Sequence, residues 1–247
     1  MDIKQYLDST YLKTAEQAGV TEEENILIAQ QFIQEAIEEN FKLIMLRPNR
    51  VALAKEMILK AKSTVQVGTV IDFPHGKSAV EEMLKEAVQA IHDGADDLDF
   101  VCNYQAFKNG AFDLVKKEIL ECTQLGLDKK KVVKWIIEVA ALNDKEIIQL
   151  SSLIKNVVVS NFEQELFSKV FVKSSTGFYK TQNNLPNGAT VPAIKMMLEN
   201  ASPLPVKAAG GVRTYEEAVE MIEMGVKRIG TSGAKMIANG QNFNNEY

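Results

Sequence analysis

At 247 residues, the chain is long enough for one large domain or two small ones, and its 25% charged residues are ordinary for a globular protein. A formal net charge of −5 argues against general nucleic-acid binding, and no stretch is long and apolar enough to cross a membrane. The N-terminus lacks the apolar segment of a signal peptide, and Cys102 and Cys122 provide neither a disulfide framework nor a metal motif, so we expect a cytoplasmic protein.

Short apolar runs alternate with helical patterns along the chain. The predicted strands are Gln5–Asp8, Lys42–Leu46, Val65–Ile71, Leu98–Cys102, Val132–Val139, a run that ends at Lys173, Leu204–Ala208 and Lys227–Gly230. The predicted helices include Val51–Lys60, Ala79–His92 and Phe112–Thr123, and capping residues at Thr21, Asn143, Thr190 and Thr214 start others. The region Lys155–Ser168 is ambiguous, because Val157–Val159 fits a strand or a buried helix.

Eight strands that alternate with helices predict a parallel sheet, and eight in a chain of this size favour a closed (β/α)8 barrel over an open sheet. No linker or composition shift divides the chain. We therefore expect one domain over residues 1–247, with a polar tail from about residue 239 to residue 247. In such a barrel, chemistry belongs at the C-terminal ends of the strands.

Charged residues recur in or at the ends of the predicted strands. They are Asp8 in the first, Asp99 in the fourth, Lys134 and Glu138 on one face of the fifth, Lys173 at the end of the sixth and Lys207 in the seventh. If Trp135 and Val206 face the helices, then Lys134, Glu138 and Lys207 face the barrel axis. For Lys134 and Glu138, the alternative to a function is a buried layer of ion pairs that fills the barrel.

A lysine at the end of a strand can be a solvated charge, an anion ligand or an amine nucleophile. Lys173 and Lys207 stand on adjacent strands, which lie about 5 Å apart. Like charges at that range lower the pKa of one lysine, and the free amine can attack a carbonyl to form a Schiff base. Asp99 can carry the protons that this reaction moves, serve as the counter-ion of Lys207, or do both.

Glycines follow the last two strands. Gly210-Gly211 comes after the seventh strand, and Gly230-Thr231-Ser232-Gly233 comes after the eighth. These loops commonly bind phosphate in this barrel, because glycines let backbone amides approach an anion closely. Gly177 can contribute an amide from the loop after the sixth strand.

Seven segments together resemble the deoxyribose-phosphate aldolase family of class I aldolases, and the similarity covers nearly the whole chain. They are LDST (Leu7–Thr10), DFPHG (Asp72–Gly76), GADDLDFV (Gly94–Val101), KWIIE (Lys134–Glu138), VKSSTGF (Val172–Phe178), VKAAGGVRT (Val206–Thr214) and RIGTSG (Arg228–Gly233). The resemblance implies a (β/α)8 barrel that reversibly cleaves 2-deoxy-D-ribose 5-phosphate to D-glyceraldehyde 3-phosphate and acetaldehyde. It also implies that the reaction needs no metal and no external cofactor.

By position in these segments, Lys173 matches the Schiff-base lysine, Lys207 the second lysine that lowers its pKa, and Asp99 the proton relay. The expected substrate-binding and phosphate-binding set is Thr10, Gly177, Gly210, Gly211, Gly230, Ser232 and Gly233, with Asp8, Lys134 and Glu138 as accessory candidates. Some members end in a tyrosine that reaches the site and assists proton transfer. Tyr247 is therefore a candidate, and a disordered terminus is the alternative.

The chain departs from the family pattern at three positions. Ser9 stands where His is frequent, Met45 where Cys is frequent, and Arg47 where a neutral residue is more usual. These departures concern the fit of the substrate rather than the reaction. The expected partners are a sugar phosphate, an aldehyde and a second copy in a homodimer. The competing readings are a Schiff-base aldolase for a different sugar phosphate and a sugar-phosphate-binding barrel without catalysis.

Overall fold

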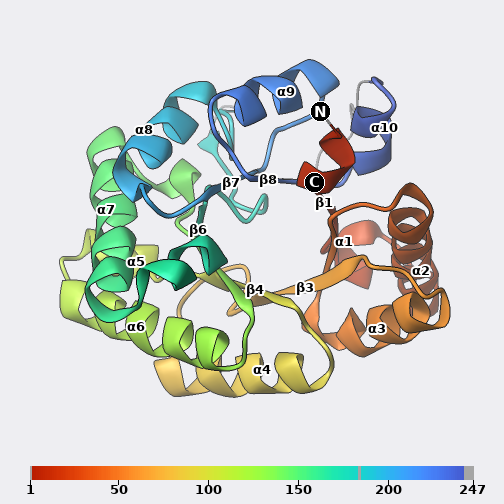
Figure 1. Cartoon of the computed structure of the whole chain (residues 1–247), viewed down its shortest axis with the longest axis horizontal. Coiled ribbons are helices and arrows are strands. Elements are labelled where there is room, and N and C mark those ends of the chain that lie inside the picture. Colours follow the sequence, from red (N-terminus) through yellow and green to blue (C-terminus); the bar gives the residue numbers. More distant parts are fainter. Residues whose placement is uncertain (1, 183–184, 242–247) are drawn as a thin grey trace.

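The computed structural model describes residues 2–182 and 185–241. Eight parallel strands close into a barrel in which each strand pairs with the next in sequence and β8 pairs with β1. Helices surround the strands (Figure 1). The predicted (β/α)8 fold is confirmed. Within the described part of the chain, no helix has both the length and the apolar character needed to cross a membrane.

The strands are β1 Leu7–Tyr11, β2 Leu43–Leu46, β3 Gln66–Ile71, β4 Asp97–Val101, β5 Val132–Ile136, β6 Val170–Lys173, β7 Val206–Ala209 and β8 Arg228–Thr231. The α-helices are α1 Ala15–Ala18, α2 Glu22–Glu39, α3 Val51–Lys60, α4 Val80–His92, α5 Tyr104–Lys108, α6 Phe112–Asp128, α7 Asp144–Asn161, α8 Val191–Ala201, α9 Tyr215–Glu223 and α10 Ala234–Ala238. Short 3-10 helices are η1 Ile3–Tyr6, η2 Pro48–Arg50, η3 Val139–Ala141 and η4 Gln164–Lys169.

Most predicted strands differ from the observed ones by one or two residues, and the first and fifth differ most. The first begins at Leu7 rather than Gln5, because the side chain of Asp2 caps a 3-10 helix that runs to Tyr6. The fifth ends at Ile136 rather than Val139, because Glu138 has a φ of 56°, which extended backbone does not allow.

The ambiguous region Lys155–Ser168 contains the end of α7 and most of η4, joined by the extended residues Phe162 and Glu163. The three valines Val157–Val159 belong to α7, in which Val158 is fully buried and Val159 is 41% exposed. A helix at the surface buries some side chains and exposes the next ones, as seen for these two valines. A strand of this barrel has both faces covered and would bury both valines.

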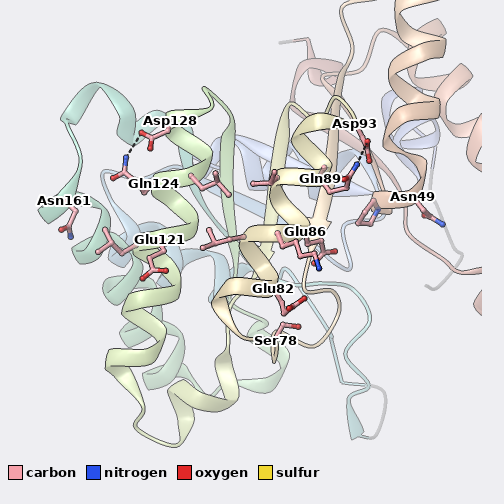
Figure 2. Close-up of a pocket in the computed structure, with 17 residues that line it drawn as sticks. Asn49, Ser78, Glu82, Glu86, Gln89, Asp93, Glu121, Gln124, Asp128 and Asn161 are labelled. Atoms are coloured by element: carbon pink, nitrogen blue, oxygen red, sulfur yellow. Dashed lines mark hydrogen bonds between the residues drawn. The ribbon is translucent and has the colours of Figure 1, made fainter.

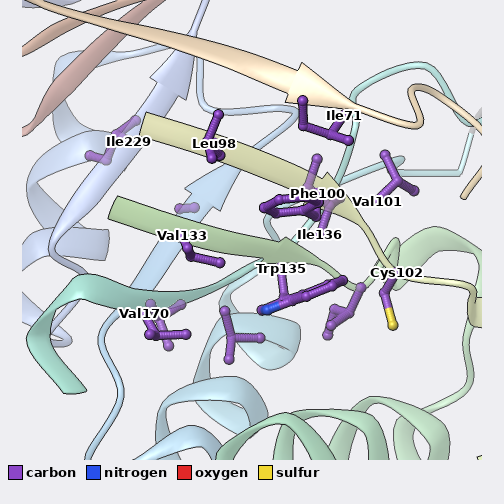
Figure 3. Close-up of a cluster of buried hydrophobic side chains, with 14 of the residues drawn as sticks. Ile71, Leu98, Phe100, Val101, Cys102, Val133, Trp135, Ile136, Val170 and Ile229 are labelled. Carbon is purple, nitrogen blue, oxygen red and sulfur yellow. The ribbon is translucent and has the colours of Figure 1, made fainter. Parts of the chain in front are cut away.

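The main core lies between the barrel and its helices (Figure 3). Trp135 of β5 stacks on Phe100 of β4 with a centroid distance of 5.2 Å, and its ring nitrogen donates to Thr123 of α6 at 3.0 Å. Trp135 and Phe100 thus face the helices. Because side chains alternate along a strand, Lys134 and Asp99 point to the barrel axis, as predicted.

The barrel interior is divided into two parts. Next to β2 and β3 it is apolar, with a cluster of Leu12, Leu43, Met45 and Val70 against which Phe73 and Phe178 pack. The remaining interior holds charged side chains, and these form the candidate site.

Candidate active site

Seven charged side chains meet inside the barrel. They are Asp8, Asp97, Asp99, Lys134, Lys173, Lys207 and Arg228. None of these side chains is more than 7% exposed. Buried charges are tolerated when they are paired, and in this network every member is paired with at least one group of opposite sign.

Asp99 is the centre of the network. Its Oδ1 accepts a hydrogen bond from Lys134 at 2.7 Å, and its Oδ2 accepts from Lys173 at 2.9 Å and from Lys207 at 3.0 Å. Lys173 and Lys207 are direct register partners on β6 and β7. The structure therefore brings together the three residues for which a catalytic role is expected.

Asp8 and Asp97 pair with the remaining cations. Lys207 Nζ lies 2.6 Å from Asp8, Lys134 Nζ lies 2.7 Å from Asp97, and Arg228 Nε donates to Asp8 at 2.7 Å. A second Arg228 nitrogen lies 3.5 Å from Asp97. Each of these cations has two carboxylate partners, and Lys173 has one among the described residues.

The charge balance singles out Lys173. With every group ionised, four cations face three carboxylates, so loss of one proton brings the network to neutrality. Burial lowers the pKa of Lys173 to about 8, with Asp99 opposing the shift and Lys207 adding to it. Burial alone would raise the pKa of Asp99, but Lys134, Lys173 and Lys207 hold it well below its usual range. The network thus offers a neutral amine beside an ionised carboxylate.

Lys134 stays charged. Burial alone would lower its pKa, but Asp97 and Asp99 outweigh burial and raise it. The expectation that Lys134 and Glu138 share one strand face is wrong, because Glu138 follows the end of β5. Its carboxyl group instead hydrogen bonds to Ser175 and to the amide of Thr176, both in the loop after Lys173.

The predicted phosphate loops lie against one another. At Gly210, with a φ of 79°, a Cβ atom would lie 3.0 Å from Gly188 Cα and 3.3 Å from Ser175 Oγ. Thr231 Oγ1 donates to the carbonyl of Val212 at 3.2 Å. The loops that follow β6, β7 and β8 therefore converge.

Other members of the predicted substrate-binding set have different surroundings. Gly230 lies within β8 rather than after it, and a Cβ there would lie 3.1 Å from Lys207 Cε, so it makes room for Lys207. The amide of Gly177 donates to Ser175 Oγ at 2.9 Å. Thr10 donates to the Asp8 carbonyl at 2.9 Å.

Gly211 and Gly233 are the remaining glycines of the predicted phosphate-binding set. Gly211 has a φ of 86° and open space where a Cβ would point. Gly233 is the N-cap residue of α10, its amide donates to Thr231 Oγ1 at 3.1 Å, and Ser232 before it is partly exposed.

The three departures from the family pattern occupy distinct places. Met45 belongs to the apolar interior, Ser9 is buried with an Oγ that has no hydrogen-bond partner, and the Arg47 guanidinium lies 4.9 Å from the Phe73 ring centroid and 5.9 Å from that of Phe178. Tyr247 lies outside the described residues.

Sequence reasoning missed two members of the network, Asp97 and Arg228. Both could have been found from strand parity, because Asp97 lies two residues before Asp99 and Arg228 two residues before Gly230. No group of three or more His, Cys, Asp or Glu residues that could hold a metal ion occurs in residues 2–182 and 185–241.

A groove of about 1400 Å³ lies on the outside of the barrel along α4 and α6 (Figure 2). Acidic and amide side chains line it together with Val88, which is 51% exposed. None of the predicted site residues lines this groove, so it is separate from the charged network.

A buried lysine that can lose its proton beside an ionised carboxylate, at the C-terminal end of a barrel strand, is the arrangement of an enzyme that forms a Schiff base with a carbonyl substrate. Fold and site therefore define the class as a (β/α)8 enzyme that forms a Schiff base on a buried lysine. The family model described as DeoC/LacD family aldolase matches residues 13–240, and the chain belongs to this family.

Curated relatives and solved structures agree. A deoxyribose-phosphate aldolase of Thermococcus gammatolerans is 40% identical over 97% of this chain and 96% of its own length, and one of Streptococcus suis is 36% identical over the full length of both. A solved structure titled QR15, an aldolase, has a TM-score of 0.79 at 32% identity and covers 97% of this chain and 95% of its own. Membership of an aldolase family indicates an enzyme rather than a sugar-phosphate-binding barrel without catalysis.

Proposed function

We propose that this aldolase reversibly cleaves 2-deoxy-D-ribose 5-phosphate to D-glyceraldehyde 3-phosphate and acetaldehyde, through a Schiff base on Lys173. The observation that carries the proposal is the position of Lys173, which is buried, has one carboxylate partner among the described residues and has its pKa lowered by burial to about 8. The names of the relatives support the choice of substrate.

The reaction begins with attack of the neutral Lys173 amine on the C1 aldehyde of the open-chain sugar. Loss of water from the carbinolamine gives a protonated imine, and Asp99, 2.9 Å from Lys173 Nζ, is placed to carry the protons. The C2–C3 bond then breaks. Its electron pair moves into the imine to form an enamine, while the C3 hydroxyl loses its proton and becomes the aldehyde of glyceraldehyde 3-phosphate.

Release of the second product reverses the first steps. Protonation of the enamine at C2 and attack of water on the resulting imine free acetaldehyde and regenerate Lys173. Lys134 and Lys207 keep Asp99 ionised in the resting enzyme, ready to accept a proton, because both lie within 3.0 Å of its carboxylate oxygens. The loops at Gly210, Gly211 and Gly233 would hold the phosphate.

Trapping with borohydride tests the proposal. Reduction in the presence of 2-deoxyribose 5-phosphate should fix a secondary amine on Lys173, identified by peptide mass, and EDTA should leave activity intact. Lys173→Met should give no adduct, whereas Lys195→Met, on an exposed face of α8, should be labelled as the wild type is. An adduct with other sugar phosphates but not with this one would assign a different substrate.

We place the enzyme in the cytoplasm. A sugar phosphate carries charge that does not cross a bilayer unaided, so the enzyme is expected where its substrate is formed. Fractionation of cells, with the activity followed in each fraction, tests this location.

We also propose a homodimer. Leu27 on α2 and Leu59 on α3 are 57% and 66% exposed, on helices that neighbour each other (Figure 1). Contact with a second copy would remove exposed apolar surface of this kind from water. A structure from Aeropyrum pernix, with a TM-score of 0.76 at 26% identity over 96% of this chain and 89% of its own, is titled a tetrameric deoxyribose phosphate aldolase. Light scattering should give a dimer mass, which Leu59→Ser should reduce; a monomeric wild type contradicts the proposal.

A further inference from the structure

Glu138 is buried directly after β5, where the loops that follow β5 and β6 meet. Its side chain is 1% exposed, and its φ of 56° turns the chain out of the strand. Its carboxyl group hydrogen bonds to Ser175 and Thr176, two and three residues after Lys173. Glu138 therefore fixes the loop that begins at Lys173.

The hydroxyl of Ser175 has one proton and two oxygen neighbours. Its Oγ lies 2.8 Å from Oε1 of Glu138 and 2.6 Å from the carbonyl oxygen of Asn187, and it accepts the amide proton of Gly177 at 2.9 Å. A carbonyl oxygen cannot donate a hydrogen bond, so Ser175 gives its proton to Asn187. The hydrogen bond between Ser175 and Glu138 then requires a proton on Oε1 of Glu138.

The other carboxyl oxygen needs no proton. Oε2 accepts from the amide of Thr176 at 3.2 Å and from the Thr176 hydroxyl, which itself accepts from the amide of Phe178 at 3.0 Å. One proton on Oε1 therefore satisfies every contact of the carboxyl group. Burial raises the pKa of Glu138 and outweighs its hydrogen bonds with Thr176 and Ser175 and the charge of Lys173. A raised pKa favours the protonated carboxyl that these contacts require.

Two titratable groups on other elements face Glu138. Lys173 at the end of β6 lowers its pKa through positive charge. Tyr104 of α5, whose ring packs edge-on against Tyr179 with centroids 6.5 Å apart, has its own pKa raised by burial and then by Glu138. A charged Lys173 favours an ionised Glu138, and an ionised Glu138 favours a charged Lys173. A neutral Glu138 therefore makes it easier for Lys173 to lose its proton.

The proton on Glu138 determines how the segment at Asn187 is held. Asn187 accepts from Ser175, and its Nδ2 donates to the carbonyl of Gly177 at 3.2 Å. The next residue, Gly188, lies so close to the turn at Gly210 that a Cβ on it would be 2.3 Å from the Gly210 carbonyl oxygen. An ionised Glu138 would accept the hydrogen bond of the Ser175 hydroxyl. The Ser175 and Asn187 oxygens would then face each other with no proton between them and repel each other.

We propose that Glu138 is a positioning residue that works as a neutral acid: its proton lets Ser175 hold Asn187, which keeps the Gly210 turn in the shape that receives the phosphate. The effect on phosphate binding rests on the proposed function, whereas the protonation of Glu138 is independent of it. Ionisation of Glu138 weakens the preference for a phosphorylated sugar, whereas the pH dependence of kcat follows Lys173.

The protonation state can be measured in the resting enzyme without substrate. Carbon-13 NMR of protein labelled at glutamate carboxyls should show a Glu138 signal that titrates above the ordinary value for glutamate, about 4.3, beside the raised signals of Glu35, Glu86 and Glu118. That signal should be absent in Glu138→Gln and shifted in Ser175→Ala, which assigns it by two variants. A Glu138 carboxyl that is ionised at neutral pH, with an ordinary or lowered pKa, overturns the proposal.

Kinetics test the consequence for the phosphate. The ratio of kcat/KM for 2-deoxyribose 5-phosphate to that for 2-deoxyribose removes the contribution of Lys173, because both sugars use it. The loss of one hydrogen bond predicts a fall of about three- to tenfold in this ratio as Glu138 ionises. In Glu138→Gln, whose amide can donate to Ser175 without titrating, the ratio should be independent of pH, and in Ser175→Ala it should be low throughout.

The outcomes separate the two proposals. A wild type that is inactive on both sugars refutes the proposed substrate and leaves the NMR result to decide on Glu138. A ratio that falls with pH equally in the wild type and in Glu138→Gln overturns the role of Glu138, whatever the substrate.

Discussion

At the scale of single residues, the number of partners of each cation explains which lysine can react. Lys173 shares Asp99 with two other lysines and has no second carboxylate among the described residues, whereas Lys207 also reaches Asp8. A pKa of about 8 leaves about one Lys173 in ten neutral at pH 7, against about one in 3,000 at the ordinary value of 10.5. This difference is what makes covalent chemistry at Lys173 practical.

Replacing Lys207 by Leu should shift the pH dependence of the reaction upward. Without Lys207, three cations face three carboxylates, so the proton on Lys173 becomes necessary for neutrality and its pKa rises. In the wild type, kcat/KM should rise up to about pH 8 and then level. In Lys207→Leu, the rising limb should move up by about one pH unit or more, with about a tenfold loss at pH 7.

The measurement is a pH profile of kcat/KM for both proteins, with Lys195→Leu, on the exposed face of α8, as the control. An unchanged limb in Lys207→Leu would show that burial alone sets the pKa of Lys173.

At the scale of elements, the sequence predicted the positions of the strands more accurately than their ends. Apolar runs identify β2 and β3 because burial on both faces leaves a continuous apolar signal. The end of β5 was not predictable in this way, because Ile137 and Val139 continue that signal beyond the strand. Glu138 ends β5 through a positive φ and contacts with Thr176, which lies 38 positions later.

The two glycines after β7 should respond differently to substitution. Both have a positive φ, so alanine costs backbone strain of about 1–2 kcal/mol at each. At Gly210 a Cβ would also lie 3.0 Å from Gly188 Cα, whereas at Gly211 it meets nothing within 4 Å. Gly210→Ala should therefore raise the KM for the phosphorylated sugar more than Gly211→Ala does.

Urea unfolding and KM values for 2-deoxyribose 5-phosphate and 2-deoxyribose, measured on both variants, check this expectation. If Gly211→Ala were the more damaging substitution, the turn at Gly210 would not be the part that shapes the phosphate site.

At the scale of the whole molecule, the buried Lys173 lowers the free energy of unfolding. The pKa of Lys173 is lower in the folded chain than in the unfolded chain, so the unfolded chain binds more protons between about pH 8 and 10.5. The free energy of unfolding should therefore increase with pH across this window. Below pH 8 the full penalty applies, on the order of 3 kcal/mol.

Lys173→Met should remove this penalty. Asp99 keeps Lys134 and Lys207 as partners, so no carboxylate is left unpaired. We expect the variant to be more stable than the wild type by about 1–3 kcal/mol at pH 7, with a smaller difference at pH 9.5. Urea unfolding at both pH values measures this difference, and Lys195→Met gives the baseline for an exposed lysine. A difference that grows with pH would contradict the sign of the shift.

The sequence by itself predicted the barrel, selected Lys173, Lys207 and Asp99 as candidate catalytic residues and indicated that they point into the protein. Alternation of side chains and of elements is a local property, so it can be read from residue order. The tertiary structure decided which charges pair. Arg228 meets Asp8 across 220 positions of sequence, because β8 closes onto β1. The proton that Glu138 needs also follows from contacts between separate loops, since the number of acceptors around Ser175 exists only after folding.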